Sequence, residues 1–204
     1  MGSGRWNVGT YQTRAVDKAA AGKSTFDYTD DVRAGRATGV NPLVDPATVA
    51  GPASPFAGQV MREVVITDEH PNPTAIAVVL DVTGSNFHAA VTAHGKLPNL
   101  LKVLQEKGYA DDPQILFGAI GDAHSDHVAL QMGQFESDNR MDEQLEAIFL
   151  EGNGGGQRQE TYELAAYFLA RHTHLQPLEK HGRKGYVFFV GDEMPYDVIR
   201  KGAY

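Results

Sequence analysis

Short apolar runs alternate with amphipathic segments from about residue 58 onwards, and this alternation predicts a layered α/β fold. The run "IAVVL" at 76–80 is apolar at every position, as is typical of a central parallel strand that is covered on both faces. The runs at 114–121 and 185–191 have the same character and predict two further buried strands. A shorter strand is expected at 64–67, and the segment 127–135 predicts an antiparallel strand at one edge of the sheet.

Three segments between these strands have helical character. The segment 86–109 contains Gly95 and Pro98, which are expected to break or kink a helix there. The segments 140–150 and 160–172 each predict a helix of about three turns. In the first of them the apolar side chains share one helical face: Met141, Leu145, Ile148 and Phe149. Helices between parallel strands indicate that helices flank a mostly parallel sheet.

The first 57 residues differ from the rest of the chain. They are rich in Gly, Ala, Pro and Thr, and they show neither clean alternation nor a helical period. We therefore divide the chain into an irregular N-terminal arm, 1–57, and a main domain, 58–204. The arm is expected to pack on the main domain or on a partner.

Composition narrows the classes of function. The chain has 204 residues, is 42% hydrophobic and 22% charged, and carries a formal net charge of -8. This acidic balance argues against a broad surface for nucleic acid or an anionic membrane, and it suits a protein that holds a cation. The absence of cysteine excludes disulfides and thiolate metal sites. No apolar run approaches the roughly 20 residues that cross a bilayer, and the first residues lack the apolar core of a signal peptide, so we expect a cytoplasmic protein.

The strongest candidate chemistry follows the central strand, in the sequence "DVTGS". In an extended turn Asp81, Thr83 and Ser85 alternate and point to one side, where they offer a carboxylate and two hydroxyls. These are hard oxygen donors, the type that Mg²⁺, Mn²⁺ and Ca²⁺ prefer. Helix capping would explain one of the hydroxyls. It would not explain a carboxylate at the end of a hydrophobic strand, where removing it from water is costly.

Two later segments carry further acidic residues. Glu160 follows the glycine-rich sequence "GGGQRQ" and stands at the start of a predicted helix, where the helix dipole also favours a carboxylate. Asp192 ends the last apolar strand, as Asp81 ends the central one. In parallel sheets ligands bind beyond the carboxyl ends of the strands, so Asp81 and Asp192 are expected to meet there if their strands are neighbours.

The order of these segments resembles the von Willebrand factor A family over residues 75–195. The matching segments are "IAVVLDVTGSNF", "FGAIGDAHSD" with "LQMGQFESD", "GGGQRQETYELA" and "YVFFVGDE". The family has a Rossmann-like fold, and its metal-ion-dependent adhesion site takes an Asp-x-Ser-x-Ser loop, a Thr or Glu from a second loop and an Asp from a third. In this chain Thr83 replaces the first serine of that motif.

The resemblance implies a metal-dependent protein-binding module rather than an enzyme. It implies a Mg²⁺ ion, or Mn²⁺ or Ca²⁺, held by Asp81, Thr83, Ser85, Glu160 and Asp192, with Thr161 as the alternative second-loop ligand. The implied partner is a protein that presents an Asp or Glu, with no role for nucleic acid or membrane. The family fold continues with a strand and a helix after the third loop that this chain does not show. The sheet edge left uncovered would invite pairing with another chain and leaves self-association open.

Two other functions remain to be compared with this one. A haloacid-dehalogenase-like, Mg²⁺-dependent phosphohydrolase would use Asp81 as a nucleophile, the "GDEMPYD" segment as its last acidic motif, and Lys184 as the nearby lysine. That family needs an acid two residues after the nucleophile, where this chain has Thr83, so protonation of the leaving group would suffer. A component of an assembly, without a working site, is the third possibility.

Overall fold

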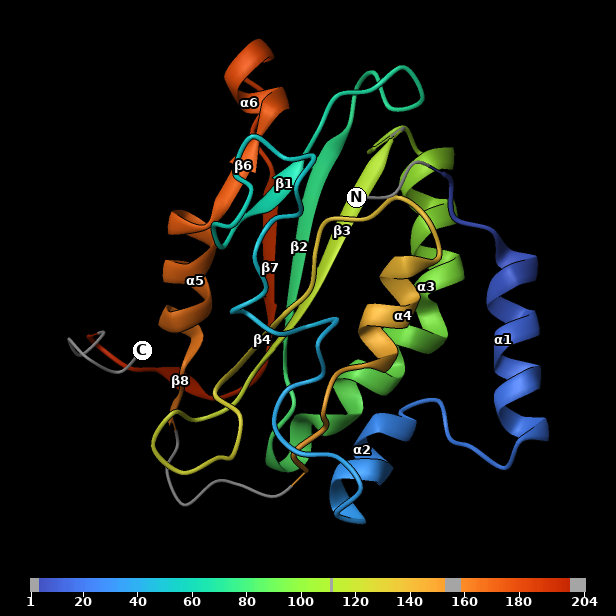
Figure 1. The fold of residues 1–204 in the computed structure, drawn as a ribbon, viewed down its shortest axis with the longest axis vertical. Helices are drawn as coiled ribbons and strands as arrows, with labels where there is room; N and C mark the ends of the chain where they lie inside the picture. Colours follow the sequence, from blue (N-terminus) through green and yellow to red (C-terminus); the bar gives the residue numbers. More distant parts are fainter. Residues whose placement is uncertain (1–3, 111, 153–158, 199–204) are drawn as a thin grey trace.

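The computed structural model of the chain describes residues 4–110, 112–152 and 159–198, except the side chains of Ser85, Phe87 and Gln105. The chain is a mixed α/β structure built on a mostly parallel sheet of four strands (Figure 1). The spatial order is β4 (Leu130–Met132), β3 (Pro113–Ile120), β2 (Thr74–Asp81) and β7 (Tyr186–Val190). Strands β3, β2 and β7 are parallel, and β4 is antiparallel to β3, which confirms the predicted antiparallel edge strand.

Two pairs of short strands lie outside this sheet. Strand β1 (Arg62–Val64) pairs in parallel with β6 (Thr173–Leu175). Strand β5 (Gln159–Glu160) pairs in parallel with β8 (Met194–Pro195). In the second pair, β5 follows the glycine-rich loop and β8 follows β7. This pairing brings Glu160 to the carboxyl end of the main sheet.

The helices lie on both faces of the sheet (Figure 1). Helices α3 (His88–Glu106) and α4 (Arg140–Glu146) lie on one face, and α5 (Tyr162–Arg171) lies on the other. A 3₁₀ turn, η1 (Gly84–Phe87), leads from β2 into α3, and α6 (Gln176–His181) follows β6. None of the helices in the described part of the chain is both long and apolar enough to cross a membrane.

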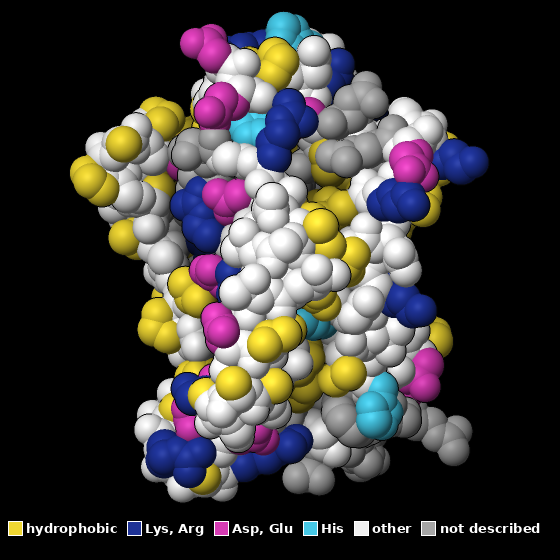
Figure 2. Space-filling view, turned by 90° about the vertical axis from the view of Figure 1, so that its right-hand side faces the viewer, with side chains coloured by type: hydrophobic (Ala, Val, Ile, Leu, Met, Phe, Trp, Pro, Cys, Tyr) yellow, Lys and Arg dark blue, Asp and Glu magenta, His cyan; other side chains and the backbone are white. Residues whose placement is uncertain are grey.

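The prediction that the N-terminal arm is irregular is wrong for two of its segments. These form the helices α1 (Val8–Ala20) and α2 (Asp27–Arg33). Helix α1 has no buried residue, and it contacts the main domain through polar groups. Arg14 binds Asp142 at 2.7 Å and Glu143 at 2.6 Å, and Lys18 binds Glu146 at 2.7 Å. Because none of its residues is buried, α1 is held on the main domain largely by these ion pairs. On this side of the molecule, charges of both signs are interspersed over the surface (Figure 2).

Gly95 and Pro98 were expected to break or kink the helix, and a break is wrong, because α3 is continuous from His88 to Glu106. Proline has no N–H, so Pro98 leaves the carbonyl oxygen of His94 without its helical donor. The hydroxyl of Tyr11, from α1, donates to that oxygen at 3.0 Å. The docked arm thus supplies the hydrogen bond that the proline removes.

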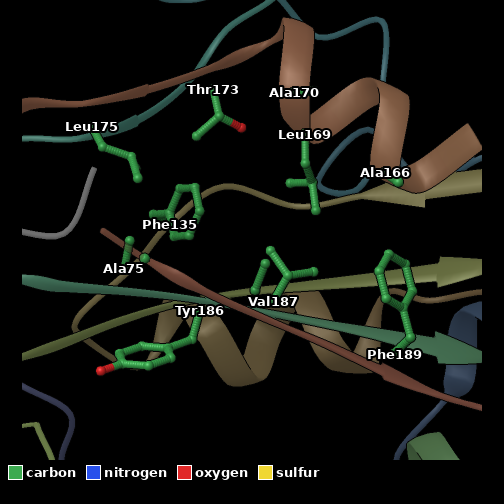
Figure 3. Close-up of a pocket in the computed structure, with 12 residues that line it drawn as sticks. Ala75, Phe135, Ala166, Leu169, Ala170, Thr173, Leu175, Tyr186, Val187 and Phe189 are labelled. Carbon is green, nitrogen blue, oxygen red and sulfur yellow. The ribbon is translucent and has the colours of Figure 1, made fainter. Parts of the chain in front are cut away.

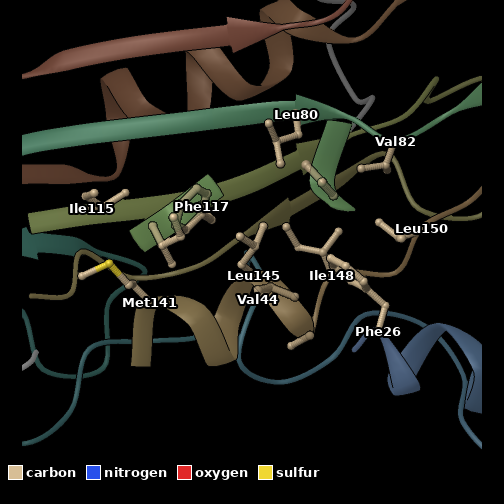
Figure 4. Packing of buried hydrophobic residues seen from close by; sticks show 14 of the residues in the cluster. Phe26, Val44, Leu80, Val82, Ile115, Phe117, Met141, Leu145, Ile148 and Leu150 are labelled. Atoms are coloured by element: carbon tan, nitrogen blue, oxygen red, sulfur yellow. The ribbon is translucent and has the colours of Figure 1, made fainter. Parts of the chain in front are cut away.

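The two faces of β2 contribute to two separate cores, as alternation along a strand requires. On the α5 side, Ala77 and Val79 pack with Leu116, Leu164 and Phe168. An apolar groove opens between α5 and the sheet on this side, next to β7 (Figure 3). On the other side, Leu80 lies among side chains from β3, from α4 and the segment after it, and from the arm (Figure 4): Ile115, Phe117, Leu145, Ile148, Phe26 and Val44.

The prediction that β7 is buried is wrong. All five of its residues are exposed, whereas β3 is buried throughout. An apolar run predicts a strand but does not identify what covers it. Strand β7 is the last strand of the sheet, and the described helices cover β2 and β3 rather than β7.

The docking of α1 predicts a measurable loss on removing Arg14. Asp142 is fully buried, and burial raises the pKa of its carboxyl although Arg14 opposes this. The substitution Arg14→Met leaves that carboxylate without its cation and is expected to lower the free energy of unfolding by about 3 kcal/mol in urea denaturation. The control Arg36→Met removes an exposed pair with Asp31 and should change it by less than about 0.5 kcal/mol. Equal effects of the two substitutions would contradict this role of Arg14.

Candidate functional site

Three aspartates stand at one rim of the sheet because their strands are parallel and in register. Asp81 pairs with Ile120 across β2 and β3, and Leu80 pairs with Val190 across β2 and β7. Asp122 and Asp192 each follow two residues after these partners and therefore lie at the same end of the sheet as Asp81. This end is where ligands bind in parallel α/β sheets.

The centre of the rim is a hydroxyl between two buried carboxylates. The Oγ1 atom of Thr83 lies 2.8 Å from Asp81 Oδ1 and 2.7 Å from Glu160 Oε1. A hydroxyl has a single hydrogen, so Thr83 donates to one of these oxygens, and the other contact needs a proton or a cation of its own. Asp81 also accepts a hydrogen bond from the backbone N–H of Thr83 at 2.9 Å. Glu160 is therefore the carboxylate with fewer hydrogen bonds to stabilise its charge.

Glu160 is 2% exposed, and its Oε2 atom is buried with no hydrogen-bond partner in the described structure. Burial raises the pKa of Glu160 from 4.5 to about 7; the hydrogen bond with Thr83 opposes this rise, and the negative charges of Asp81, Asp126 and Asp122 add to it. No salt bridge joins Asp81, Glu160 or Asp192 to a basic side chain within residues 4–110, 112–152 and 159–198. The rim thus holds excess negative charge.

Asn86 connects the central strand to the loop after β7. Its Nδ2 group donates to Asp81 Oδ2 at 3.1 Å and to Asp192 Oδ1. Asp192 is exposed, so one side of the site opens to solvent. Nothing in the sequence pattern singled out Asn86, whose only signal is its place in the turn after a strand that ends on a carboxylate.

Asp122 differs from Glu160 because its carboxylate is fully supported. Its Oδ2 accepts from Ser125 Oγ at 2.7 Å, and its Oδ1 accepts from Tyr196 Oη at 2.9 Å and His124 N at 3.0 Å. Burial alone would raise the pKa of Asp122, but these hydrogen bonds hold it below its usual value. Asp122 is thus stable as an anion and adds to the negative field at Glu160.

Tyr162 forms the wall of the site next to β7. Burial raises the pKa of its hydroxyl, and the charges of Asp81 and Glu160 raise it further. The ring lies beside Phe189, with the centroids 6.0 Å apart. A side chain at position 191 would overlap the Tyr162 hydroxyl and approach Asp81 Cβ to 2.9 Å, so glycine is required there for the strands to pack this closely.

The structure brings together four of the five residues proposed as metal ligands. Asp81, Thr83 and Glu160 are in direct contact, and Asp192 joins them through Asn86. The fifth, Ser85, belongs to η1, and its side chain lies outside the described residues, as does most of the glycine-rich loop before Glu160.

Two expectations about the second loop need correction. Glu160 belongs to the short strand β5 rather than to the start of a helix, which begins at Tyr162. The hydroxyl of Thr161, the alternative ligand, is already hydrogen-bonded to backbone groups. It donates to Gly121 O at 2.6 Å and accepts from Ala123 N at 2.8 Å. Thr161 therefore fixes the loop after β3 rather than facing the other candidate ligands.

The donor side chains that the structure describes do not form a closed cage. Among the described residues, no three His, Asp or Glu side chains are close enough together to hold a metal ion by themselves. The acidic groups meet through Thr83 and Asn86 instead. The arrangement is therefore a partly hydroxyl-lined, anionic rim with one open side.

The chain was compared with known proteins in three ways. No protein-family model, no curated protein and no solved structure matches it.

The raised pKa of Glu160 predicts how stability depends on pH in the absence of divalent cations. The folded protein holds the Glu160 proton more tightly than the unfolded chain, so the free energy of unfolding falls as pH rises from about 4.5 to about 7. We expect this group to contribute a loss of roughly 3 kcal/mol across that range. Glu160→Gln should remove this component, measured by urea denaturation in chelator at several pH values. The exposed control Glu106→Gln should retain it, and identical pH profiles for all three proteins would exclude a perturbed Glu160.

The close approach at Gly191 predicts a position-specific loss of stability. Gly191→Ala is expected to lower the free energy of unfolding by about 1–3 kcal/mol, because the new methyl group overlaps the Tyr162 hydroxyl. Adding Tyr162→Phe removes that hydroxyl and should recover part of the loss. Gly51→Ala, at a position with open space around it, is the control for a change of glycine alone. A neutral Gly191→Ala in thermal denaturation would contradict the packing described for β2, β7 and α5.

Proposed function

We propose that this chain is a von Willebrand factor A-type binding module that holds a divalent cation at the rim and captures an acidic group of a protein partner. The observation that carries the proposal is the buried pair Asp81 and Glu160, which share the single hydroxyl of Thr83. Two buried carboxylates in this arrangement require a proton or a positive charge between them. The Oε2 atom of Glu160, which has no hydrogen-bond partner among the described residues, marks where such a charge would be stabilised.

The chemistry of the donors fits a hard cation. The proposed ligands are all oxygen donors: Asp81, Thr83, Ser85, Glu160 and Asp192. Oxygen-only sites favour Mg²⁺, Mn²⁺ or Ca²⁺, and Mg²⁺ is the first choice because it retains water ligands that a partner can replace. When bound, the cation would neutralise the carboxylates and offer a position for an additional anionic oxygen.

The surroundings of the rim favour a protein partner. Exposed Asp192 opens the site to solvent, and the exposed apolar side chains of Met194 and Val198 follow on the same segment. An acidic side chain would supply the ionic contact, and the apolar neighbours would supply contact area around it. The role proposed for Asn86 is to position Asp81 and Asp192 relative to each other.

The sheet order supports assigning a Rossmann-like fold of this type. The adjacent parallel strands β2 and β7 end in candidate ligands at one rim, and the antiparallel β4 forms the far edge of the sheet. The first loop, the strand after the glycine-rich loop and the end of β7 contribute in the order that the sequence resemblance implies.

The phosphohydrolase alternative is weakened by the position of Lys184. This residue comes two positions before Tyr186, the first residue of β7, which pairs with Ile76 near the start of β2, so Lys184 lies at the opposite end of the sheet from Asp81. It lines a surface pocket there with Thr74 and Tyr186. Asp81 also accepts hydrogen bonds at both carboxylate oxygens, which suits a ligand or structural carboxylate better than a nucleophile.

The test is stabilisation of the protein by the metal. Adding Mg²⁺ or Mn²⁺ to chelator-treated protein should raise the melting temperature. The free energy of unfolding should rise by about 2.7 kcal/mol when the ion is at about a hundred times its dissociation constant. Asp81→Ala and Glu160→Gln should lose most of this response, and Asp197→Asn, an exposed change on the neighbouring loop, should retain it. No shift in the wild type, or equal shifts in all four proteins, would reject the proposal.

Capture of the acidic group needs a separate measurement. A short peptide containing one Asp should bind the wild type in Mg²⁺ and not in chelator, and the matched peptide with Asn should bind in neither. Binding of both peptides irrespective of the metal would contradict a cation-mediated contact.

A further inference from the structure

Strand β7 is an open edge with apolar side chains on both of its faces. Its exposed fractions are 56% for Tyr186, 50% for Val187, 53% for Phe188, 41% for Phe189 and 43% for Val190. Its only ladder partner in the described part of the chain is β2, so its outer edge presents unpaired backbone N–H and C=O groups. Proteins usually protect such an edge with charges, proline or a bulge, and residues 186–190 contain no proline or charged residue.

The two faces of β7 are both incompletely covered. Val187 and Phe189 point toward α5 and line the groove there, whereas Tyr186 points away from it (Figure 3). The groove has a volume of about 340 Å³ and is lined mainly by alanine, leucine and aromatic side chains. On the opposite face the rings of Tyr186 and Phe188 stack with centroids 6.5 Å apart. An occupant must therefore pair with the backbone and place apolar groups on both faces, which an extended strand does.

The sequence around β7 is complementary to itself in the antiparallel direction. If Phe188 lies opposite Phe188 of a second copy, then Val187 lies opposite Phe189, and Tyr186 lies opposite Val190. Each of these is an aromatic pair or a pair of an aromatic with a β-branched residue, the cross-strand combinations that stabilise antiparallel strands. Because the axis is perpendicular to the sheet, each side chain stays on its own face and meets a side chain on the same face.

The charges that flank β7 agree with the same register. Gly185 would lie opposite Gly191, after which Lys184 faces Asp192 and Arg183 faces Glu193 of the second copy. Lys184, Arg183 and Asp192 are exposed, and Glu193 is partly exposed. A parallel arrangement of the two strands would place each charge opposite its own kind instead, which is unfavourable. The pattern of charges thus selects antiparallel pairing with an identical strand.

From these observations we propose that β7 is a dimer interface at which two copies of this chain pair antiparallel about a twofold axis at Phe188. The dimer joins the two sheets into one continuous sheet and removes the open edge. It also brings Val187 and Phe189 of each copy against those of the other at the mouth of the groove under α5. The two rims then lie at opposite ends of the joined sheet, because the strands run in opposite directions.

The dimer is independent of the cation proposed above. Of its contacts, only the Lys184–Asp192 pair involves a proposed metal ligand. The tests therefore use Phe188, Arg183, Glu193 and the strand itself, and they are carried out in chelator. Failure of the metal response would leave the outcome of these tests unaffected.

The absence of cysteine makes cross-linking a direct test of register. The variant Phe188→Cys places two thiols opposite each other at the axis, within the separation of about 4.5–5.5 Å between Cβ atoms of paired residues, and should form a disulfide-linked dimer on oxidation. Tyr186→Cys alone should not, because the two positions lie about four residues, or roughly 13 Å, apart. A mixture of Tyr186→Cys and Val190→Cys should cross-link. Equal cross-linking of all three single variants, or none in any sample, would overturn the proposal.

Sedimentation velocity over a concentration series tests the energetic part. Wild-type protein should show a monomer–dimer equilibrium, and Phe188→Lys should raise the dissociation constant roughly thirtyfold or more, as expected for a central aromatic residue at an interface. Val16→Lys, an equally exposed apolar change on α1, should leave it unchanged. Thermal denaturation verifies that each variant is folded.

Charge reversal distinguishes a second copy from any other partner. Arg183→Glu should weaken the dimer because two acidic groups then face each other, and Arg183→Glu combined with Glu193→Arg should restore it. Recovery in the double variant supports the antiparallel register. A wild type that is monomeric at every concentration would overturn the proposal, as would a dimer that responds to neither Phe188→Lys nor Arg183→Glu.

Discussion

The hydroxyl group of Thr83 is the contact on which the rest of the rim depends. Thr83 lies within hydrogen-bonding distance of both Asp81 and Glu160, and its single hydrogen satisfies only one of them. The surrounding structure makes this shortage unavoidable: both carboxylates are buried, and Asp122 and Asp126 increase the negative field. The groups meet because the parallel strands end at one rim and β5 is held against β8. Bringing their negative charges together lowers the stability of the folded chain. Sites that bind a cation or a proton are expected to have such a cost before the ligand arrives.

The sequence pattern predicted the parts of the fold that depend on hydrophobic periodicity and on the direction of the strands. Strands β2 and β3, the antiparallel β4, and the meeting of Asp81 with Asp192 at one rim all follow from buried parallel strands and their register. It missed α1, a helix that buries none of its residues and docks through Arg14 and Lys18. Asn86 was missed because its role is defined by two carboxylates that meet only in the folded chain.

The burial of β7 was misjudged for a different physical reason. Apolar residues at every position show that a strand gains from being covered on both faces, but not whether this chain provides the cover. The structure leaves "YVFFV" exposed, and its self-complementary flanks provide a physical reason for the exposure. The rim and the β7 edge are thus two places where the chain alone satisfies its own groups incompletely. Within the described residues, no basic side chain pairs with the carboxylates of the rim, and no strand pairs with the outer edge of β7.

The most direct measurement is anomalous scattering from crystals grown with Mn²⁺. The account predicts one strong anomalous peak at the rim, bordered by Asp81, Thr83 and Glu160, with Glu160 Oε2 directed toward it. An absent peak at saturating Mn²⁺, or one located away from Glu160, would show that Asp81 and Glu160 are stable beside the single Thr83 hydroxyl without a bound cation. That result would contradict the central claim.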